Sequence, residues 1–181
     1  MEKRLLGKTG IEVSVLGMGG LFVSGFGGND RERSCQAVNR ALELGVNYVD
    51  TAPNYSNSEE MLGYALEGIT KPYYLSTKIG GRPQPFNAKD NDLLRKSVEE
   101  SLCLLKRDTI DVLMIHEPDR PGQYDWWDNY DNFHGPVCEL LDQLKSENII
   151  RFTGLGGTTA YQLPQIMATG NYDVVLTAFN Y

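Results

Sequence analysis

Apolar residues occur along this chain either in short continuous runs, which predict strands, or every three to four residues, which predicts helices. At the start, the short apolar stretches Arg4–Leu6 and Glu12–Val15 flank the turn signal GKTG (Gly7–Gly10). Two such stretches joined by a glycine-containing turn predict a β-hairpin. The second stretch continues into VSVLGMGG, an apolar run that ends in glycines and predicts a further strand.

Beyond residue 30, helical periodicity alternates with continuous apolar runs. Leu94, Val98, Leu102 and Leu105 show the helical spacing of three or four residues. The predicted helices are Arg31–Leu44, Ser58–Leu66, Leu93–Leu105, Val137–Leu144 and Ala160–Met167. We expect Asn29 or Asp30 to cap the first helix, Ser58 to cap the second, and Pro164 to interrupt the last. The runs NYVDTA, YYLSTKIG, IDVLMIHEPD, RFTGLGG and DVVLTAFNY are predicted strands.

Six strands therefore follow the hairpin in a strand–helix rhythm, which predicts a parallel α/β sheet with helices packed outside. A doubly wound open sheet and a (β/α)8 TIM barrel both fit. The doubly wound dinucleotide fold favours a G-x-G-x-x-G turn, but Phe22 and Thr159 stand at the sixth positions after Gly17 and Gly154. We therefore predict a barrel with an N-terminal hairpin. A complete barrel takes about 250 residues, so we expect residues 1–181 to form one C-terminally incomplete domain of about six units.

Charge and cysteine usage narrow the class of protein. The 181 residues include 24 acidic and 17 basic side chains, a net charge of -7. Because nucleic acids and anionic membranes attract basic surfaces, we expect neither as a partner. Cys35, Cys103 and Cys138 are scattered without paired spacing, which favours a reducing compartment over a disulfide framework. No apolar run predicts a signal peptide or a membrane span, so we expect a cytoplasmic location.

One long segment, Arg120–Pro136, breaks the rhythm after the IDVLMIHEPD strand. It places aromatic residues, among them Trp126 and Trp127, between acidic ones. Two interpretations remain open: a surface loop with its own aromatic cluster, or a wall of a binding pocket at the active end of the barrel. In the second interpretation, Trp126 and Trp127 are candidate substrate contacts.

The candidate chemistry lies where three successive strands end. Asp50, Lys78 and His116 each stand at the carboxyl end of a predicted strand, and Tyr55 follows on the loop after Asp50. Each residue alone has an ordinary structural explanation, such as a turn, a solvated lysine or a packed ring. Because the carboxyl ends of parallel strands meet at one face of a barrel, the four together predict a shared site.

These residue types suit proton transfer to or from a carbonyl or alcohol oxygen. A phenol ordinarily ionises near pH 10, and an adjacent ammonium stabilises its anion. A buried lysine needs a counter-ion such as Asp50, and His116 can orient a substrate oxygen. A redox reaction would also need a hydride, which no side chain supplies, so a cofactor is required.

The chain resembles the aldo-keto reductase superfamily from Arg4 to its last residue. The matching segments are RLLGKTGIEVSVLGMGG, VNYVDTAPNYSNSEEMLG, LSTK, IDVLMIH and IIRFTGLGG. The resemblance implies a (β/α)8 barrel with its hairpin across the bottom. It also implies NAD(P)-dependent interconversion of small-molecule carbonyls and alcohols, with NADP(H) expected ahead of NAD(H) and no metal.

The resemblance also implies roles for individual residues. Tyr55 would be the general acid/base, Lys78 and Asp50 would tune it, and His116 would orient the substrate. Gly19 and Gly20 would border the nicotinamide end of the cofactor, beside Asp50. Gly156 and Gly157 fall where the family often has a Ser-Asn pair that holds the carboxamide, so backbone groups or Thr158 are the alternatives. Ser56 stands where the family usually has glycine, a difference that we expect to matter little.

The family's seventh and eighth units, which grip the cofactor phosphates, are not in this sequence. We therefore expect a fragment of a longer protein and weak cofactor binding by the 181 residues alone. A regulatory barrel subunit with little turnover is the alternative function. A metal-dependent hydrolase is disfavoured, because the chain has two histidines and His116-Glu117-x-Asp119 has no further ligands nearby. The sequence leaves the physiological substrate and the oligomeric state open.

Overall fold

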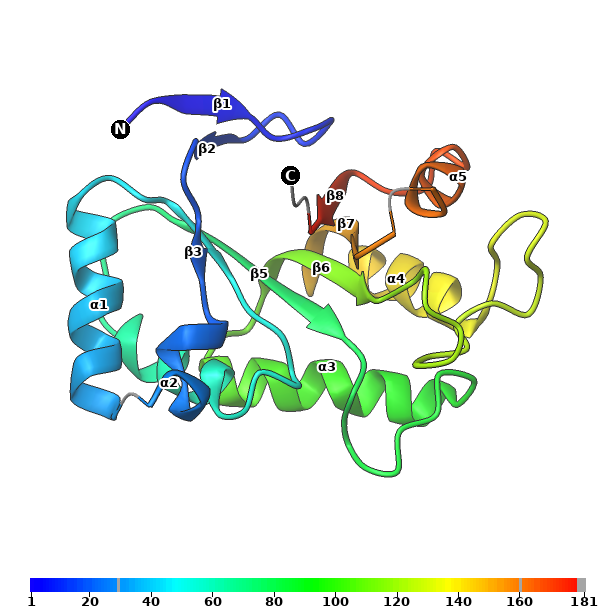
Figure 1. Ribbon diagram of the computed structural model, residues 1–181, viewed down its shortest axis with the longest axis horizontal. Helices are drawn as coiled ribbons and strands as arrows, with labels where there is room; N and C mark the ends of the chain where they lie inside the picture. Colours follow the sequence, from blue (N-terminus) through cyan, green and yellow to red (C-terminus); the bar gives the residue numbers. More distant parts are fainter. Residues whose placement is uncertain (29, 160, 179–181) are drawn as a thin grey trace.

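The computed structural model describes residues 1–28, 30–159 and 161–178, and its centre is a curled parallel sheet (Figure 1). The strands are β3 (Met18–Gly19), β4 (Tyr48–Asp50), β5 (Tyr74–Ile79), β6 (Ile110–His116), β7 (Ile150–Gly157) and β8 (Val174–Thr177). They pair in chain order, and every pairing is parallel. The sheet is a half-barrel of six strands, which confirms the predicted barrel-type α/β fold.

The N-terminal hairpin is present as predicted. Strands β1 (Lys3–Leu5) and β2 (Glu12–Ser14) pair antiparallel, and Gly7 and Gly10 of the turn adopt positive φ angles of 51° and 71°. Leu6 packs with Val112 and Phe152 inside the curl. Figure 1 shows the hairpin beside the ends at which the sheet strands begin, so it covers the side opposite to the strand ends that carry the candidate site.

All five predicted helices form, with shifted ends. They are α1 (Arg31–Glu43), α2 (Ser58–Ala65), α3 (Asn91–Leu105), α4 (Pro136–Ser146) and α5 (Leu163–Met167), and the short 3-10 turns η1 (Leu21–Val23) and η2 (Gly25–Gly27) precede α1. Asp30 caps α1 by accepting from the Arg33 amide at 2.9 Å. The alternative cap Asn29, and Ala160 at the predicted start of the last helix, lie outside the described residues.

Two predictions about helix ends are wrong. Ser58 does not cap α2, because Asn57 holds the N-cap position and the Ser58 hydroxyl donates to the Gly20 carbonyl instead, at 2.8 Å. Pro164 does not interrupt α5 but stands in its first turn. A proline is tolerated there, because the first amides of a helix have no partner within the helix.

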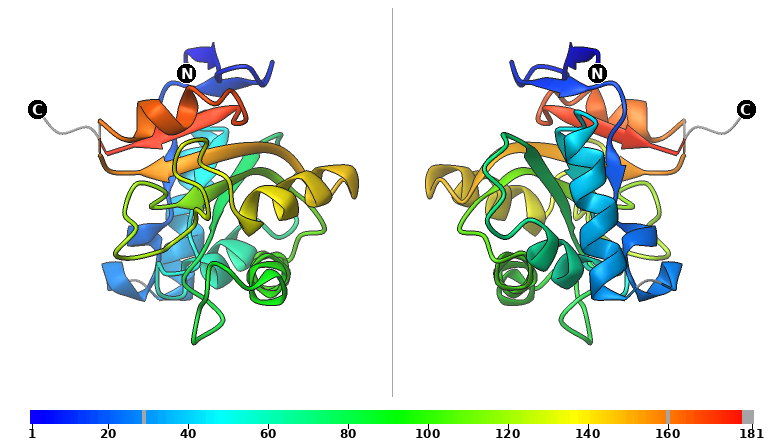
Figure 2. Two further views of the ribbon diagram at one scale, coloured as in Figure 1. Left: turned by 90° about the vertical axis from the view of Figure 1, so that its right-hand side faces the viewer. Right: turned by 90° about the vertical axis from the view of Figure 1, so that its left-hand side faces the viewer.

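The helices lie on the outer side of the curl (Figure 2). Side chains that alternate along each strand therefore pack either outward against the helices or inward within the curl. Leu113 and Ile115 of β6 pack outward in a cluster that includes Leu94 and Val98 of α3 and Leu140 of α4. Each fully buried side chain of this kind contributes about 1.5–3 kcal/mol. The neighbouring positions Val112 and Met114 face inward with Val174.

Two findings bear on the cysteines and on membrane spans. The three cysteines lie on α1, α3 and α4 and form no disulfide. Within the described residues, every helix is too short or too polar to cross a bilayer.

Candidate active site

The parallel register brings the strand ends to one edge of the half-barrel. Asp50 is the last residue of β4, Lys78 lies one residue before the end of β5, and His116 ends β6. Across the pairings, Asp50 lies opposite Ser76 and His116 lies opposite Gly156. Side chains at alternate positions point into the curl, so all three chemically distinctive residues face the same interior.

Lys78 is the buried charge of the site. Its side chain is 2% exposed, and its ammonium lies 2.8 Å from Asp50 Oδ2. It also donates to the Thr51 carbonyl at 2.7 Å. Asp50 is held in turn by the Ser76 hydroxyl, which donates to Oδ1 at 2.9 Å. Pairing and hydrogen bonding of this kind offset the cost of burying an ionic group.

Tyr55 enters the site from the loop between β4 and α2. Its ring is half-buried, with the Lys78 ammonium 5.0 Å from the ring centroid. The His116 ring meets it edge-on, 6.0 Å between centroids. Directly after it, Ser56 has a φ angle of 52°. This left-handed conformation is one that glycine adopts more readily than serine.

His116 is a neutral imidazole. Burial and the nearby Lys78 ammonium lower the pKa of His116 to about 3. Its backbone carbonyl accepts from the Trp126 indole at 2.8 Å, which fixes the strand end. Among the described residues its Nδ1 atom has no hydrogen-bond partner although it is buried. A neutral ring can donate one hydrogen bond and accept another.

A cavity of about 260 Å³ opens beside these side chains. Its walls are Tyr55, Lys78, His116, Glu117, Gly156, Gly157, Thr158, Leu176, Thr177 and Ala178. A Cβ atom added to Gly156 would stand 3.1 Å from Lys78 Cε, so this wall is backbone because a side chain would crowd the lysine. Small residues thus form one wall of the cavity, and Tyr55, Lys78 and His116 form the other.

Gly19 and Gly20 lie at the same edge of the sheet but do not line that cavity. Gly19 is opposite Asp50 in the register, and the Gly20 amide donates to the Asp50 carbonyl at 2.7 Å. A Cβ atom on Gly20 would overlap the Ser58 hydroxyl. Both glycines thus lie beside Asp50, and the close approach of Ser58 leaves no room for a side chain at position 20. Their contact with a cofactor stays a prediction.

The burial of Trp126 and Trp127 corrects the expectation that they contact substrate. Their side chains are 0% and 2% exposed. Each indole N–H donates to a backbone carbonyl, of His116 and of Pro118 respectively. The two rings therefore hold the backbone at and just after the end of β6. The aromatic side chain of this loop that reaches the site is the half-buried Tyr124, whose ring centroid lies 6.2 Å from that of His116.

The sequence analysis assigned no structural role to several polar residues near the site. Glu59 is 1% exposed; it pairs with Arg82 and accepts from the Thr77 hydroxyl at 2.6 Å. Asp119, 3% exposed, accepts from the Thr158 amide at 3.1 Å. The SEEMLG segment could have pointed to Glu59, but its partners, Thr77 on β5 and Arg82 on the loop after β5, lie far from it in the sequence.

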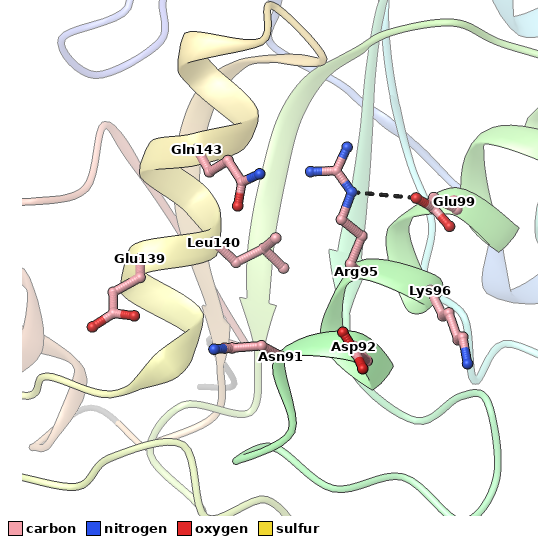
Figure 3. Close-up of a pocket in the computed structure, with 8 residues that line it drawn as sticks. All are labelled: Asn91, Asp92, Arg95, Lys96, Glu99, Glu139, Leu140 and Gln143. Atoms are coloured by element: carbon pink, nitrogen blue, oxygen red, sulfur yellow. Dashed lines mark hydrogen bonds and ion pairs between the residues drawn. The ribbon is translucent and has the colours of Figure 1, made fainter.

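A separate groove of about 470 Å³ lies between α3 and α4 (Figure 3). Its side chains are Asn91, Asp92, Arg95, Lys96, Glu99, Glu139, Leu140 and Gln143. Arg95 pairs with Glu99 at 3.2 Å, and the groove holds none of the four site residues. The part of the chain that the structure describes contains no group of three His, Cys, Asp or Glu side chains placed to hold a metal ion.

Comparison with known proteins agrees with this geometry. A family model described as the aldo/keto reductase family matches residues 15–181. L-Galactose dehydrogenase from Arabidopsis thaliana is 32% identical and aligns with 100% of this chain and 57% of its own length. NADH-specific methylglyoxal reductase from Escherichia coli is 28% identical, with 99% and 59% covered. The chain thus spans little more than half the length of these curated relatives.

Solved structures show the same fold. An aldo-keto reductase from Bacillus halodurans, determined in its holo form, superposes with a TM-score of 0.77 and 25% sequence identity. The match covers 99% of this chain and 58% of that chain. The half-barrel is therefore similar to the corresponding part of a complete reductase barrel.

Proposed function

The chain belongs to the aldo/keto reductase family, and from that premise we propose that it acts as an NAD(P)-dependent oxidoreductase that interconverts carbonyls and alcohols. The observation that carries this proposal is the buried Lys78–Asp50 pair, 2.8 Å apart, beside the Tyr55 ring. A paired ammonium held next to a phenol in a cavity is an arrangement for proton transfer.

In the proposed mechanism Tyr55 donates its phenolic proton to the carbonyl oxygen during reduction and removes it during oxidation. The Lys78 ammonium stabilises the negative charge that Tyr55 carries after proton donation. Asp50 holds Lys78 in place, since its carboxylate is itself held by Ser76.

His116 orients the substrate in this mechanism. Because burial keeps its imidazole neutral, the ring donates a hydrogen bond to the substrate oxygen without competing for the proton of Tyr55. Gly156, Gly157 and Thr158 would hold the nicotinamide end of the cofactor, with Gly19 and Gly20 at the neighbouring strand end. A bound nicotinamide dinucleotide supplies or removes the hydride.

Tyr55→Phe tests the proposal. This change removes one oxygen atom and leaves the ring that packs against His116. We expect the rate of the chemical step to fall by about 10²-fold or more, with dinucleotide binding retained, in the protein expressed from its complete reading frame. Tyr161→Phe, at a 75% exposed position, is the control. An unaltered rate in Tyr55→Phe would show that the assignment of the acid/base is wrong.

The substrate class and the cofactor form are part of the same proposal. The name of the Arabidopsis relative favours a sugar, whereas that of the E. coli relative favours a small aldehyde and NADH. We keep NADP(H) ahead of NAD(H) and a cytoplasmic location as predictions. Turnover of sugars, aldehydes and ketones with NAD(H) and with NADP(H) decides the substrate class and the cofactor form. Dinucleotide binding without turnover of any of these substrates would favour the regulatory subunit.

A further inference from the structure

We propose that the Glu117 carboxylate recognises the carboxamide of the nicotinamide ring by accepting a hydrogen bond from its N–H group. This inference rests on the proposed function and adds a residue that the sequence analysis did not assign. Gly156 and Gly157 line the same cavity and offer no side chain that could hold this group.

The composition of the cavity wall is the first support. Apart from Tyr55, Lys78 and His116, the wall consists of apolar or backbone surface and three polar side chains, those of Glu117, Thr158 and Thr177. The apolar part suits the faces of a pyridine ring. A carboxamide N–H needs an acceptor, and among these three polar side chains Glu117 carries the carboxylate, the strongest acceptor type.

The backbone of Glu117 is the second support. Its φ angle is 48°, a left-handed conformation that residues other than glycine rarely adopt and that clusters at functional sites. Its amide donates to the Gly156 carbonyl at 2.7 Å. The Trp127 indole holds the next carbonyl, that of Pro118, at 2.9 Å. The chain is thus fixed so that Glu117 stands directly beside the β7 end.

The contacts of the side chain are the third support. The Thr158 hydroxyl donates to Oε2 at 2.9 Å and lies 3.2 Å from Oε1. Arg120 Nε lies 3.2 Å from Oε2, and the Glu117 side chain is 19% exposed. A carboxylate offers about four lone-pair sites, so Oε1 keeps capacity for a donor that enters the cavity.

Thr158 acts as the positioning residue for Glu117. Its amide donates to the buried Asp119 carboxylate at 3.1 Å, and the amide and hydroxyl of Thr159 contact the same oxygen. The loops after β6 and β7 are therefore tied together twice, once through Asp119 and once through Glu117. This connection holds the carboxylate at the cavity wall before any ligand binds.

The test uses two dinucleotides that differ only in the proposed contact. One carries the natural carboxamide, and the other carries an acetyl group in its place and so lacks the N–H donor. Fluorescence titration of the protein from its complete reading frame measures the affinity for each dinucleotide, with and without the 2′-phosphate that distinguishes NADP from NAD. We expect wild type to prefer the carboxamide by about 10-fold or more, as for a hydrogen bond to a charged group.

Three variants identify the source of this preference. Glu117→Ala should bind the two dinucleotides almost equally, and Glu117→Gln, a neutral acceptor, should keep only part of the preference. Glu139→Gln, an exposed position in the groove between α3 and α4, should behave as wild type. If Glu117→Ala does not fold, the Gln variant decides.

The outcomes separate this inference from the proposed function. Failure of wild type to bind either dinucleotide would contradict both. Binding with a full carboxamide preference in Glu117→Ala, or in Glu117→Gln where the Ala variant does not fold, would overturn the role of Glu117 alone.

Discussion

Lys78 shows how one residue can organise a site. An ammonium has three N–H donors, and Asp50 and the Thr51 carbonyl take two of them. Within the described residues this leaves one donor for a further acceptor, and the ammonium lies 5.0 Å from the centre of the Tyr55 ring. The nearly complete burial of Lys78 strengthens each of these interactions, since the local dielectric is low.

His116 gives a prediction about stability and pH. The folded protein holds the pKa of His116 near 3, whereas an unfolded chain protonates histidine below about pH 6.5. Stability from this group is therefore complete above pH 6.5 and falls as the pH drops toward 3, by about 1.4 kcal/mol per pH unit. In denaturant titrations near pH 4.5 and pH 7.5, His116→Gln should lose roughly 3 kcal/mol less than wild type on acidification.

The exposed His134 supplies the matched control for this measurement. His134→Gln should keep the pH dependence of wild type, because it leaves the buried imidazole unchanged. Equal acid sensitivity of His116→Gln and wild type would show that His116 does not resist protonation in the folded state.

At the scale of elements, the start of α2 connects the loop that carries Tyr55 to β5, the strand that carries Lys78. Ser58 bonds the Gly20 carbonyl at the end of β3. Glu59 accepts from Thr77, the neighbour of Lys78, and pairs with Arg82 beyond β5. The first turn of α2 thus fixes the loop that carries Tyr55 relative to β3 and β5. The Ser58 side chain makes one of these contacts and therefore does not cap the helix.

The packing of α2 against α3 gives a prediction at the same scale. A Cβ atom on Gly63 would overlap the Leu104 carbonyl oxygen, so the two helices approach closely only because residue 63 has no side chain. We expect Gly63→Ala to reduce the free energy of unfolding by about 2 kcal/mol through overpacking, measured by urea titration.

Gly122→Ala is the control for that change. A Cβ atom there meets nothing within 4 Å, so its stability should stay within about 0.5 kcal/mol of wild type. Equal stability of Gly63→Ala and Gly122→Ala would mean that α2 and α3 can separate without cost.

The sequence could predict those parts of the site that depend on topology. Asp50, Lys78 and His116 end successive parallel strands, and the topology alone brings such residues together. It could not predict contacts that depend on the path of loops. The burial of Trp126 and Trp127, the Glu59–Arg82 pair and the position of Glu117 each follow from how a loop folds back onto the sheet, and short-range periodicity carries no information on that path.

At the scale of the whole molecule, the sequence predicted the parallel sheet, the hairpin and the outer helices, because apolar runs, helical periodicity and turn residues mark each of them locally. The exact ends of elements were less predictable, as for α3, which begins at Asn91 rather than Leu93. Caps and packing decide where a helix starts, and both depend on neighbours in space. The site lies where the most regular part of the fold, the strand ends of β4 to β7, meets its least regular loops.

The sheet itself predicts a gradient of stability across the 181-residue chain. β6 has a paired strand on each side, and Leu113 and Ile115 are completely buried. β8 is the last strand in the sheet order, with Val175 and Leu176 43% and 39% exposed. Amides of β6 should therefore exchange with solvent only through global unfolding, and those of β8 and the β1–β2 hairpin through smaller openings. Hydrogen exchange followed by mass spectrometry measures this directly, and β8 peptides that exchange as slowly as those of β6 would contradict it.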